Sequence, residues 1–323
     1  MSVFLDILSI LLFPGFAFVI VLALIYEWID RKFYAKLQNR MGPTYTGPAG
    51  VLQPFADLIK LLAKEDITPM AADRPFFSIT PVVALALMLT GVLIIPIGGA
   101  SGLLSFHGDV IVAVALMTLL AIVLFLSGLF SVNRFSIIGA ERAVLQLLGY
   151  EIPLMLAVLG VALGAGSLTL AEIAGSTKAW YLFGPQVIGF AIYIVAAQAE
   201  LERVPFDIPE AEQEIVAGWQ TEYSGRKLAL FRLTRDVELV YISGLAAALF
   251  LGGAGPVLEG IHPWMQTLLS TLLFVVKTVI ILLILSTIRA LFARLRIDQM
   301  VDFSWKYLVP ISLLQMVLVR LVI

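Results

Sequence analysis

The feature that most constrains this chain is a series of long apolar segments. A helix needs about 20 apolar residues to cross the hydrocarbon core of a bilayer. The sequence is 60% hydrophobic and only 14% charged, whereas soluble domains carry roughly 25% charged residues. We therefore predict an all-α polytopic membrane protein with about eight transmembrane helices, forming one domain over residues 1–323. The predicted spans lie near residues 3–28, 76–97, 110–132, 143–164, 183–199, 237–255, 264–288 and 303–323.

The placement of Lys and Arg predicts an orientation, because these residues favour cytoplasmic loops. Of the 21 basic residues, 18 fall on one side of the predicted spans. Lys178 and Arg320 fall on the other side, and Lys277 lies inside a span. We therefore expect a multi-pass plasma-membrane protein with both termini outside. Its long cytoplasmic loops would cover about residues 29–75 and 200–236.

An amphipathic segment lies within the first long loop. In VLQPFADLIKLLAKE, residues 51–65, apolar residues recur with helical periodicity and the charges fall mostly off the apolar stripe. The segment is too short and too charged to cross a membrane, so we predict a cytoplasmic helix on the membrane surface. Such a helix either merely covers the bundle, or forms a cavity wall or docks a partner.

The composition limits the chemistry that the chain can perform itself. It has no Cys and only two His, His107 and His262, which lie far apart. Thiolate-bound iron–sulfur clusters and paired-His haem ligation are therefore not expected. GPTYTGPAG, residues 42–50, is rich in turn residues and matches neither a Walker A loop nor a dinucleotide fingerprint. We expect no metal, no catalytic residue, no cofactor bound by this chain and no nucleic-acid partner; its medium is the lipid bilayer.

Ionisable side chains inside spans are candidates for function, because each costs about 2.5–3.5 kcal/mol at a helix centre on insertion scales. Glu151 lies beside Pro153 in LGYEIPL, and Lys277 lies midway along FVVKTVI. Glu141 and Arg142 precede Glu151 by two to three helical turns. We expect Pro153 to break the helix and admit water beside Glu151. These residues would then relay protons; the alternative is a structural ion pair inside the bundle.

The densest acid cluster follows the fifth apolar segment. In AELERVPFDIPEAEQEI, residues 199–215, Pro205 and Pro209 argue against a continuing helix. We expect a new helix to start at Glu210 and to place Glu214 on the same face, where the two charges repel. Some acids would then be protonated or paired; the alternative is a solvated, acidic helix start. The acids are Glu200, Glu202, Asp207, Glu210, Glu212 and Glu214. The nearby candidate cations are Arg203, Arg226 and Lys227.

Five ordered motifs cover nearly the whole chain. They are DRKFYAKLQNRMGPTYTGPAGVLQPFADLIKLLAKED (30–66), AADRPFFSITP (71–81), ERAVLQLLGYEIPL (141–154), AELERVPFDIPEAEQEIVAGWQTEYSGRKLALF (199–231) and RLRIDQMVDFSWKYLVP (294–310). In this order they resemble the H-type membrane subunit of respiratory complex I, which is subunit 1 of the mitochondrial enzyme. This family also includes the equivalent subunit of energy-converting membrane-bound hydrogenases, formate hydrogenlyase and sulfane sulfur reductase, and the chain most resembles the hydrogenase and sulfane-reductase members.

The resemblance implies an eight-helix subunit that joins a redox arm to an ion-pumping arm. The implied partners are a hydrogenase-like large subunit and an iron–sulfur small subunit on the cytoplasmic side, antiporter-like membrane subunits, and ferredoxin as electron donor. A Ni-Fe site or iron–sulfur clusters would lie in those partners, and a quinone stays open as a ligand. A line of buried carboxylates would pass the redox event into the membrane.

Two sets of residues follow from the motifs and from the ionisable side chains. The predicted relay or coupling residues are Asp73, Glu141, Arg142, Glu151, Glu200, Glu202, Arg203, Asp207, Glu210, Glu212, Glu214 and Lys277. The predicted partner-docking residues are Arg40, Gln53, Asp57, Lys60, Glu222, Tyr223 and Arg226.

Departures from the family pattern bear on the function. Glu202 stands where the quinone enzymes usually carry Asn, and LFRLTRDVEL (230–239) replaces a pattern like LFFLAEY, adding Arg232, Arg235 and Asp236. This extra charge suits an ion path better than a quinone tail. We therefore favour a non-catalytic coupling subunit of the hydrogenase or sulfane-reductase type over a quinone-site subunit of an NADH- or other donor:quinone oxidoreductase. A stand-alone proton or cation transporter is the third hypothesis.

Overall fold

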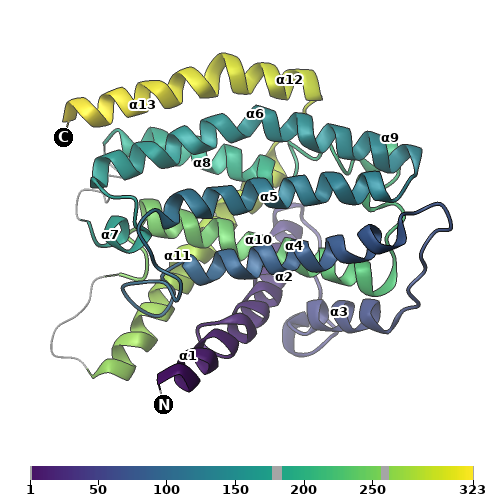
Figure 1. The fold of residues 1–323 in the computed structure, drawn as a ribbon, viewed down its shortest axis with the longest axis horizontal. Coiled ribbons are helices and arrows are strands. Elements are labelled where there is room, and N and C mark those ends of the chain that lie inside the picture. Colours follow the sequence, from purple (N-terminus) through teal and green to yellow (C-terminus); the bar gives the residue numbers. More distant parts are fainter. Residues whose placement is uncertain (1, 177–183, 256–261, 323) are drawn as a thin grey trace.

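The computed structural model describes residues 2–176, 184–255 and 262–322 (Figure 1). Within these residues the regular structure is helical, which confirms the predicted fold class. The helices are α1 Ser2–Leu11, α2 Phe16–Leu37, α3 Gln53–Ala63, α4 Arg74–Ile94, α5 Asp109–Phe130, α6 Arg134–Ala165, α7 Leu170–Gly175, α8 Gln186–Glu200, α9 Glu212–Ile215, α10 Gly225–Phe250, α11 Pro263–Leu291, α12 Ile297–Phe303 and α13 Val309–Val322.

Six stretches of the described chain are long and apolar enough to cross a membrane. They are Ile7–Leu37, Arg74–Ile94, Asp109–Phe130, Arg134–Ala165, Trp264–Leu291 and Ile297–Val322. Two further helices, α8 with 15 residues and the more charged α10, occupy the other two predicted spans. The first span is interrupted at residues 12–15 and continues to Leu37, beyond its predicted end. Phe183, the predicted start of the fifth span, and Lys178 lie outside the described residues.

Helix α10 lies at the centre of the bundle and packs against α2, α4, α8 and α11. Every residue from Val237 to Phe250 is buried. Small residues in this helix allow its neighbours to approach closely, as in other membrane bundles. Hydropathy alone therefore gives too low a score to α10, because Arg232, Arg235 and Asp236 in its first half line a cavity inside the protein.

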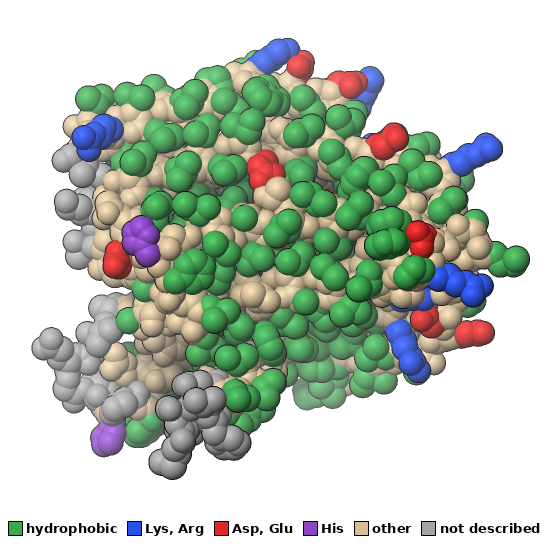
Figure 2. Space-filling view, viewed as in Figure 1, with side chains coloured by type: hydrophobic (Ala, Val, Ile, Leu, Met, Phe, Trp, Pro, Cys, Tyr) green, Lys and Arg blue, Asp and Glu red, His purple; other side chains and the backbone are tan. Residues whose placement is uncertain are grey.

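The surface supports a membrane location. Hydrophobic side chains cover the flank of the bundle, and charged side chains gather mainly at the end that carries α3, α9 and α12 (Figure 2). Both termini lie toward the opposite end (Figure 1). The surface helix is α3, which packs on α2 and α10 through Phe55 and Leu58 and exposes Ile59 and Lys60. It therefore covers the bundle and leaves an outward face open.

Two local predictions are wrong. Helix α6 runs unbroken through Pro153, because membrane helices tolerate one lost backbone hydrogen bond where neighbouring helices pack against them. The helix expected from Glu210 is reduced to α9, which has four residues. The loop instead folds back at Gly218, where φ is +52° and a Cβ would lie 1.9 Å from the Pro209 carbonyl oxygen. Only glycine fits this approach.

Candidate functional site

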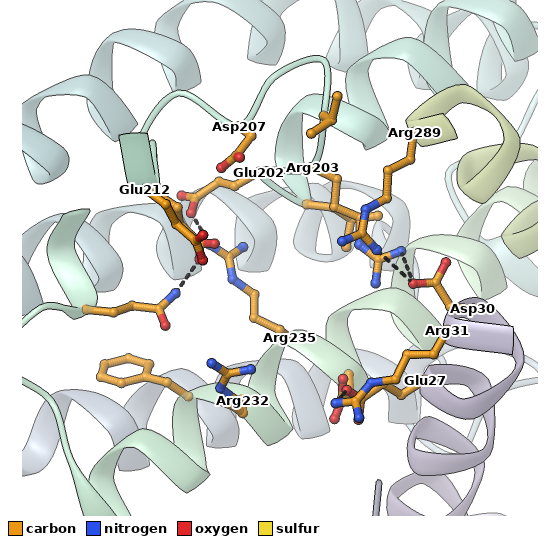
Figure 3. Close-up of a pocket in the computed structure, with 16 residues that line it drawn as sticks. Glu27, Asp30, Arg31, Glu202, Arg203, Asp207, Glu212, Arg232, Arg235 and Arg289 are labelled. Carbon is orange, nitrogen blue, oxygen red and sulfur yellow. Dashed lines mark hydrogen bonds and ion pairs between the residues drawn. The ribbon is translucent and has the colours of Figure 1, made fainter. Parts of the chain in front are cut away.

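A polar cavity of about 470 Å³ lies at the charged end of the bundle, between α2, α10, α11 and the loop that follows α8 (Figure 3). We call it the acid–arginine cavity. Its lining includes the carboxylates of Glu27, Asp30, Glu202, Asp207, Glu210, Glu212 and Asp236. Its lining also includes the guanidinium groups of Arg31, Arg203, Arg232, Arg235 and Arg289. The sequence predicted that the acids of the loop lie near the added charges Arg232, Arg235 and Asp236, but gave no prediction for the acids and arginines of α2 and α11.

Arg235 forms the central ion pair of one wall. It lies on α10, donates to Glu202 at the start of the loop, and reaches Glu238 one turn further along α10 over 3.1 Å. The indole of Trp219 donates a second hydrogen bond to Glu202 over 3.2 Å. Glu202 is 9% exposed and Glu238 is 1% exposed. Carboxylates this deeply buried stay ionised only when they are paired, so Arg235 makes both charges tenable.

A line of acids continues from this ion pair into the bundle. Glu200 ends α8, is 4% exposed, and has a hydrogen bond to the Tyr150 hydroxyl. Its charge interacts with those of both Glu238 and Glu151. Glu151 accepts a hydrogen bond from Thr118 of α5. The structure therefore brings the predicted residues Glu202, Glu200 and Glu151 into one series, and adds Glu238, which sequence analysis missed.

Glu151 does not fit the structural alternative of an ion pair. Its partner among the described residues is the Thr118 hydroxyl, and no described Arg or Lys lies within salt-bridge distance. A half-buried carboxylate with a neutral partner is able to take up or release a proton more readily than one fixed by a cation.

The loop acids Asp207 and Glu210 titrate close to neutral pH. Burial raises the pKa of Asp207 to about 6, although Arg294 opposes the shift. Burial likewise raises the pKa of Glu210 to about 7, with Arg235 opposing it. The Gln220 side chain donates a hydrogen bond to Glu210. Groups with such values can exchange protons under physiological conditions.

Glu214 lies apart from the cavity, contrary to the expectation that it shares a face with Glu210. It is exposed and pairs with Arg142 over 2.5 Å and with Arg294 over 3.4 Å. The hydrogen bond from Arg142 lowers the pKa of Glu214. Glu212 is also exposed but contributes to the cavity lining. Glu214 therefore joins the loop to α6 and to the segment after α11.

The cations expected to neutralise the acidic loop are mostly engaged elsewhere. Arg203 pairs with Asp30 over 3.3 Å. Lys227 pairs with Asp66 over 3.1 Å, and Arg226 is exposed. Arg235, Arg142 and Arg294 take the predicted role instead. Sequence proximity was a poor guide here, because the loop folds back against helices that are distant in the chain.

Asp30 is the shared partner of the polar side chains in the cavity wall opposite Arg235, and it is 2% exposed. Arg203 and Arg289 both approach its carboxylate, the latter over 3.1 Å, and Ser286 donates to it (Figure 3). Beside it, Glu27 accepts from Arg31. The available signal was the DRK sequence at the end of the first span, where charge enters an apolar helix.

Three predicted relay residues belong neither to the acid–arginine cavity, nor to the line of acids behind it, nor to the ion pair of Glu214 with Arg142. Asp73 is exposed at the start of α4, and Glu141 is exposed on α6. Lys277 donates to the carbonyl oxygens of Leu251 over 2.7 Å and Gly253 over 2.9 Å, beyond the end of α10. Lys277 therefore caps the C-terminal end of α10, whereas Arg235 lies in the N-terminal half of that helix. The last carbonyl groups of a helix have no partner within it and attract cations.

Most predicted docking residues lie on or near the surface. Arg40, Lys60 and Arg226 are exposed. Gln53 donates to Asp57 over 2.8 Å, and Asp57 accepts from Arg31 over 2.6 Å. These contacts fix the orientation of α3 on α2.

Two docking predictions fall in the loop before α10. Glu222 is partly exposed and accepts a hydrogen bond from Asn133. Tyr223 is buried, at 4% exposed, and makes its contacts inside the chain. Its ring stacks on Phe77 at 4.1 Å, and its hydroxyl donates to the Ser127 carbonyl over 3.2 Å. It anchors the loop to the bundle.

This helical membrane bundle, with charged residues lining a cavity at one end, is a membrane subunit of a complex I-like oxidoreductase. The family model described as NADH dehydrogenase matches residues 9–320, and the chain belongs to this family, that of the H-type membrane subunit of complex I. The predicted resemblance is thereby confirmed.

Relatives and one solved structure agree with this assignment. The H-type subunit of NADH-quinone oxidoreductase from Dehalococcoides mccartyi (strain ATCC BAA-2266 / KCTC 15142 / 195) is 40% identical over 304 residues, covering 94% of this chain and 83% of that protein. The equivalent H-type subunit from Thermomicrobium roseum is 39% identical, covering 91% and 89%. A chain of the membrane-bound sulfane sulfur reductase, an archaeal respiratory membrane complex, superposes with a TM-score of 0.85 at 27% identity, covering 99% of this chain and 100% of that chain.

Proposed function

We propose that this chain is the coupling subunit of an ion-translocating oxidoreductase, joining redox subunits at its charged end to pumping subunits in the membrane. The observation that carries the proposal is Arg235, which bridges Glu202 at the acid–arginine cavity and Glu238 in the bundle. In this arrangement the chain has no catalytic residue. The redox subunits, with their Ni-Fe site or iron–sulfur clusters, bind at α3 and the acidic loop on the cytoplasmic side.

In the proposed coupling, Glu202 and Glu238 compete for the guanidinium group of Arg235. Electron transfer next to the cavity changes the local charge, and Asp207 and Glu210 respond because they titrate near neutral pH. A change in their charge alters the field at Arg235, whose attraction is shared between Glu202 and Glu238. If Arg235 moves toward the loop, Glu238 must take up a proton, since an unpaired buried charge is costly. Glu200 and Glu151 then pass this change in protonation further into the bundle.

The charge in the cavity favours a ferredoxin-linked complex of the hydrogenase or sulfane-reductase type. Glu202 and Arg235 occupy the cavity as an ion pair, and a quinone tail gains little from such a lining. The whole-chain superposition on the sulfane sulfur reductase chain supports this branch. The protons or sodium ions would then be moved by antiporter-like membrane partners.

The proposal is tested by Glu151→Gln in the intact complex, with Glu172→Gln, which changes an exposed acid on α7, as the matched control. We expect Glu151→Gln to assemble normally but to build a smaller ion gradient per electron transferred, because a neutral amide cannot carry the proton. The exposed control should match the unmodified complex. Normal gradients at normal electron flux in Glu151→Gln would contradict the proposal.

A quinone-site subunit is the second candidate function, favoured by the names of relatives at 36–40% identity, which are NADH-quinone oxidoreductase subunits. The acid–arginine cavity would then hold a quinone headgroup. Extraction of the purified complex with organic solvent decides between the two. Stoichiometric quinone, together with electron transfer to added quinone, supports this candidate; absence of both leaves the ferredoxin-linked proposal.

A further inference from the structure

A second cavity of about 410 Å³ shares Arg31 and Arg289 with the acid–arginine cavity. Its lining also includes Tyr34 at the end of α2 and Arg40 with the turn that follows it. We call it the arginine pocket. Three guanidinium groups line it without a carboxylate, whereas seven carboxylates line the first cavity. Arg31 and Arg289 are paired with carboxylates outside this lining, so Arg40 supplies the positive charge that fits an anion.

The sequence around the arginine pocket is strongly basic. Residues 31–56 contain Arg31, Lys32, Lys36 and Arg40 and no Asp or Glu. This run lies where α2, part of an apolar stretch long enough to cross a membrane, ends at Leu37. Four or more Lys and Arg immediately beside a membrane span are typical of segments that bind anionic lipids.

The arginines of the pocket are held in place before any ligand arrives. The Tyr34 ring lies between two of them, with the Arg289 guanidinium at 4.5 Å and that of Arg40 at 5.5 Å from its centroid. Arg31 is fixed by Asp57 over 2.6 Å. Arg40 donates to the neutral Gln38 side chain over 2.8 Å, so its charge is not offset by that partner. A planar guanidinium matches two oxygens of a phosphate group.

Apolar side chains at the ends of the same two helices favour an amphiphile over a soluble anion. Met41 lines the pocket and is 91% exposed. Leu37 at the end of α2 is 43% exposed, and Phe292 just after α11 is 60% exposed. Lipid headgroups place phosphate beside apolar chains in this way, whereas free phosphate would gain nothing from these side chains.

We propose that the arginine pocket binds the phosphate headgroup of an anionic membrane lipid. The headgroup contacts Arg40 directly and meets Arg31 and Arg289 from the side away from Glu27 and Asp30. Because these two arginines also line the acid–arginine cavity, the bound lipid stabilises one wall of that cavity. This inference goes beyond the proposed function, since it holds whichever electron acceptor the complex uses.

The test is lipid binding to the purified, detergent-solubilised complex, titrated with phosphatidylglycerol and with phosphatidylcholine. Removing one cation in Arg40→Gln should weaken phosphatidylglycerol binding about fivefold. Lys64→Gln is the matched control, because it removes one exposed cation just after the neighbouring α3 and outside the pocket. Inorganic phosphate serves as the competing soluble anion and should not displace the lipid.

Each contrary outcome overturns a particular part of the proposal. Equal weakening of lipid binding in Arg40→Gln and Lys64→Gln would mean diffuse surface attraction instead of a pocket. Equal binding of both lipids would remove the role of the headgroup charge, and displacement by inorganic phosphate would mean a free-anion site. No lipid binding to the complex, alongside binding to the isolated subunit, would assign Arg40 to a protein contact. All of these measurements report lipid binding and none depends on enzymatic turnover. Failure of the lipid-binding proposal can therefore be told apart from failure of the proposed coupling function.

Discussion

Replacing Arg235 with Met is expected to destabilise the subunit more than removing any exposed arginine. The side chain is 18% exposed and pairs with Glu202 and Glu238, whose side chains are 8% and 1% exposed. Removing one partner of a buried ion pair typically costs about 3–5 kcal/mol, because the remaining charge stays buried and unpaired. Here two carboxylates lose their partner at once, so we expect the free energy of unfolding to fall by at least that amount.

The assay is denaturant unfolding of the purified subunit in detergent, with Arg226→Met as the matched control. Arg226 lies on the same helix but is exposed, so its removal should change stability by less than about 0.5 kcal/mol. The triple variant Arg235→Met, Glu202→Gln, Glu238→Gln has no unpaired charge and should recover most of the loss. An Arg235→Met variant as stable as the Arg226→Met control, or a triple variant less stable than Arg235→Met, would refute the ion-pair argument.

Two further predictions concern the acidic loop. Asp207 and Glu210 have pKa values of about 6 and about 7, raised from 3.8 and 4.5; the folded state therefore binds more protons than the unfolded state, and stability falls as pH rises from about 4 to 7. The double variant Asp207→Asn, Glu210→Gln should flatten this part of the pH–stability curve, and an unchanged slope would contradict the assignment. Gly218→Ala should lower the thermal midpoint, because its Cβ would lie 1.9 Å from the Pro209 carbonyl oxygen. Gly99→Ala, which has open space around it, is the control and should leave the midpoint unchanged.

The membrane helices could be predicted because burial in lipid demands long apolar runs with internally satisfied backbones. The end of α8 was also predictable, since Pro205 and Pro209 follow it closely. The limits of the helix expected from Glu210 were not predictable, because α9 ends where Val216 takes a φ of +63°, a conformation that the sequence does not signal for a β-branched residue.

The site was predictable only in part, because its contacts join distant segments. Glu202 and Arg235 each depart from the family pattern, and the structure shows that they form a single ion pair between residues 33 positions apart. Asp30 and Ser286 are 256 positions apart, which no local pattern reveals. Glu238 had a usable signal, since it lies three residues after Arg235 and so shares its helix face.

In the proposed coupling, Glu238 carries the response from the acid–arginine cavity into the bundle. This role is tested by the number of ions moved per electron by the complex carrying Glu238→Gln, reconstituted in liposomes and compared with Glu172→Gln. We expect continued electron transfer with a clearly lower ion yield in Glu238→Gln and a normal yield in the control. An ion yield in Glu238→Gln equal to that of the unmodified complex would contradict it.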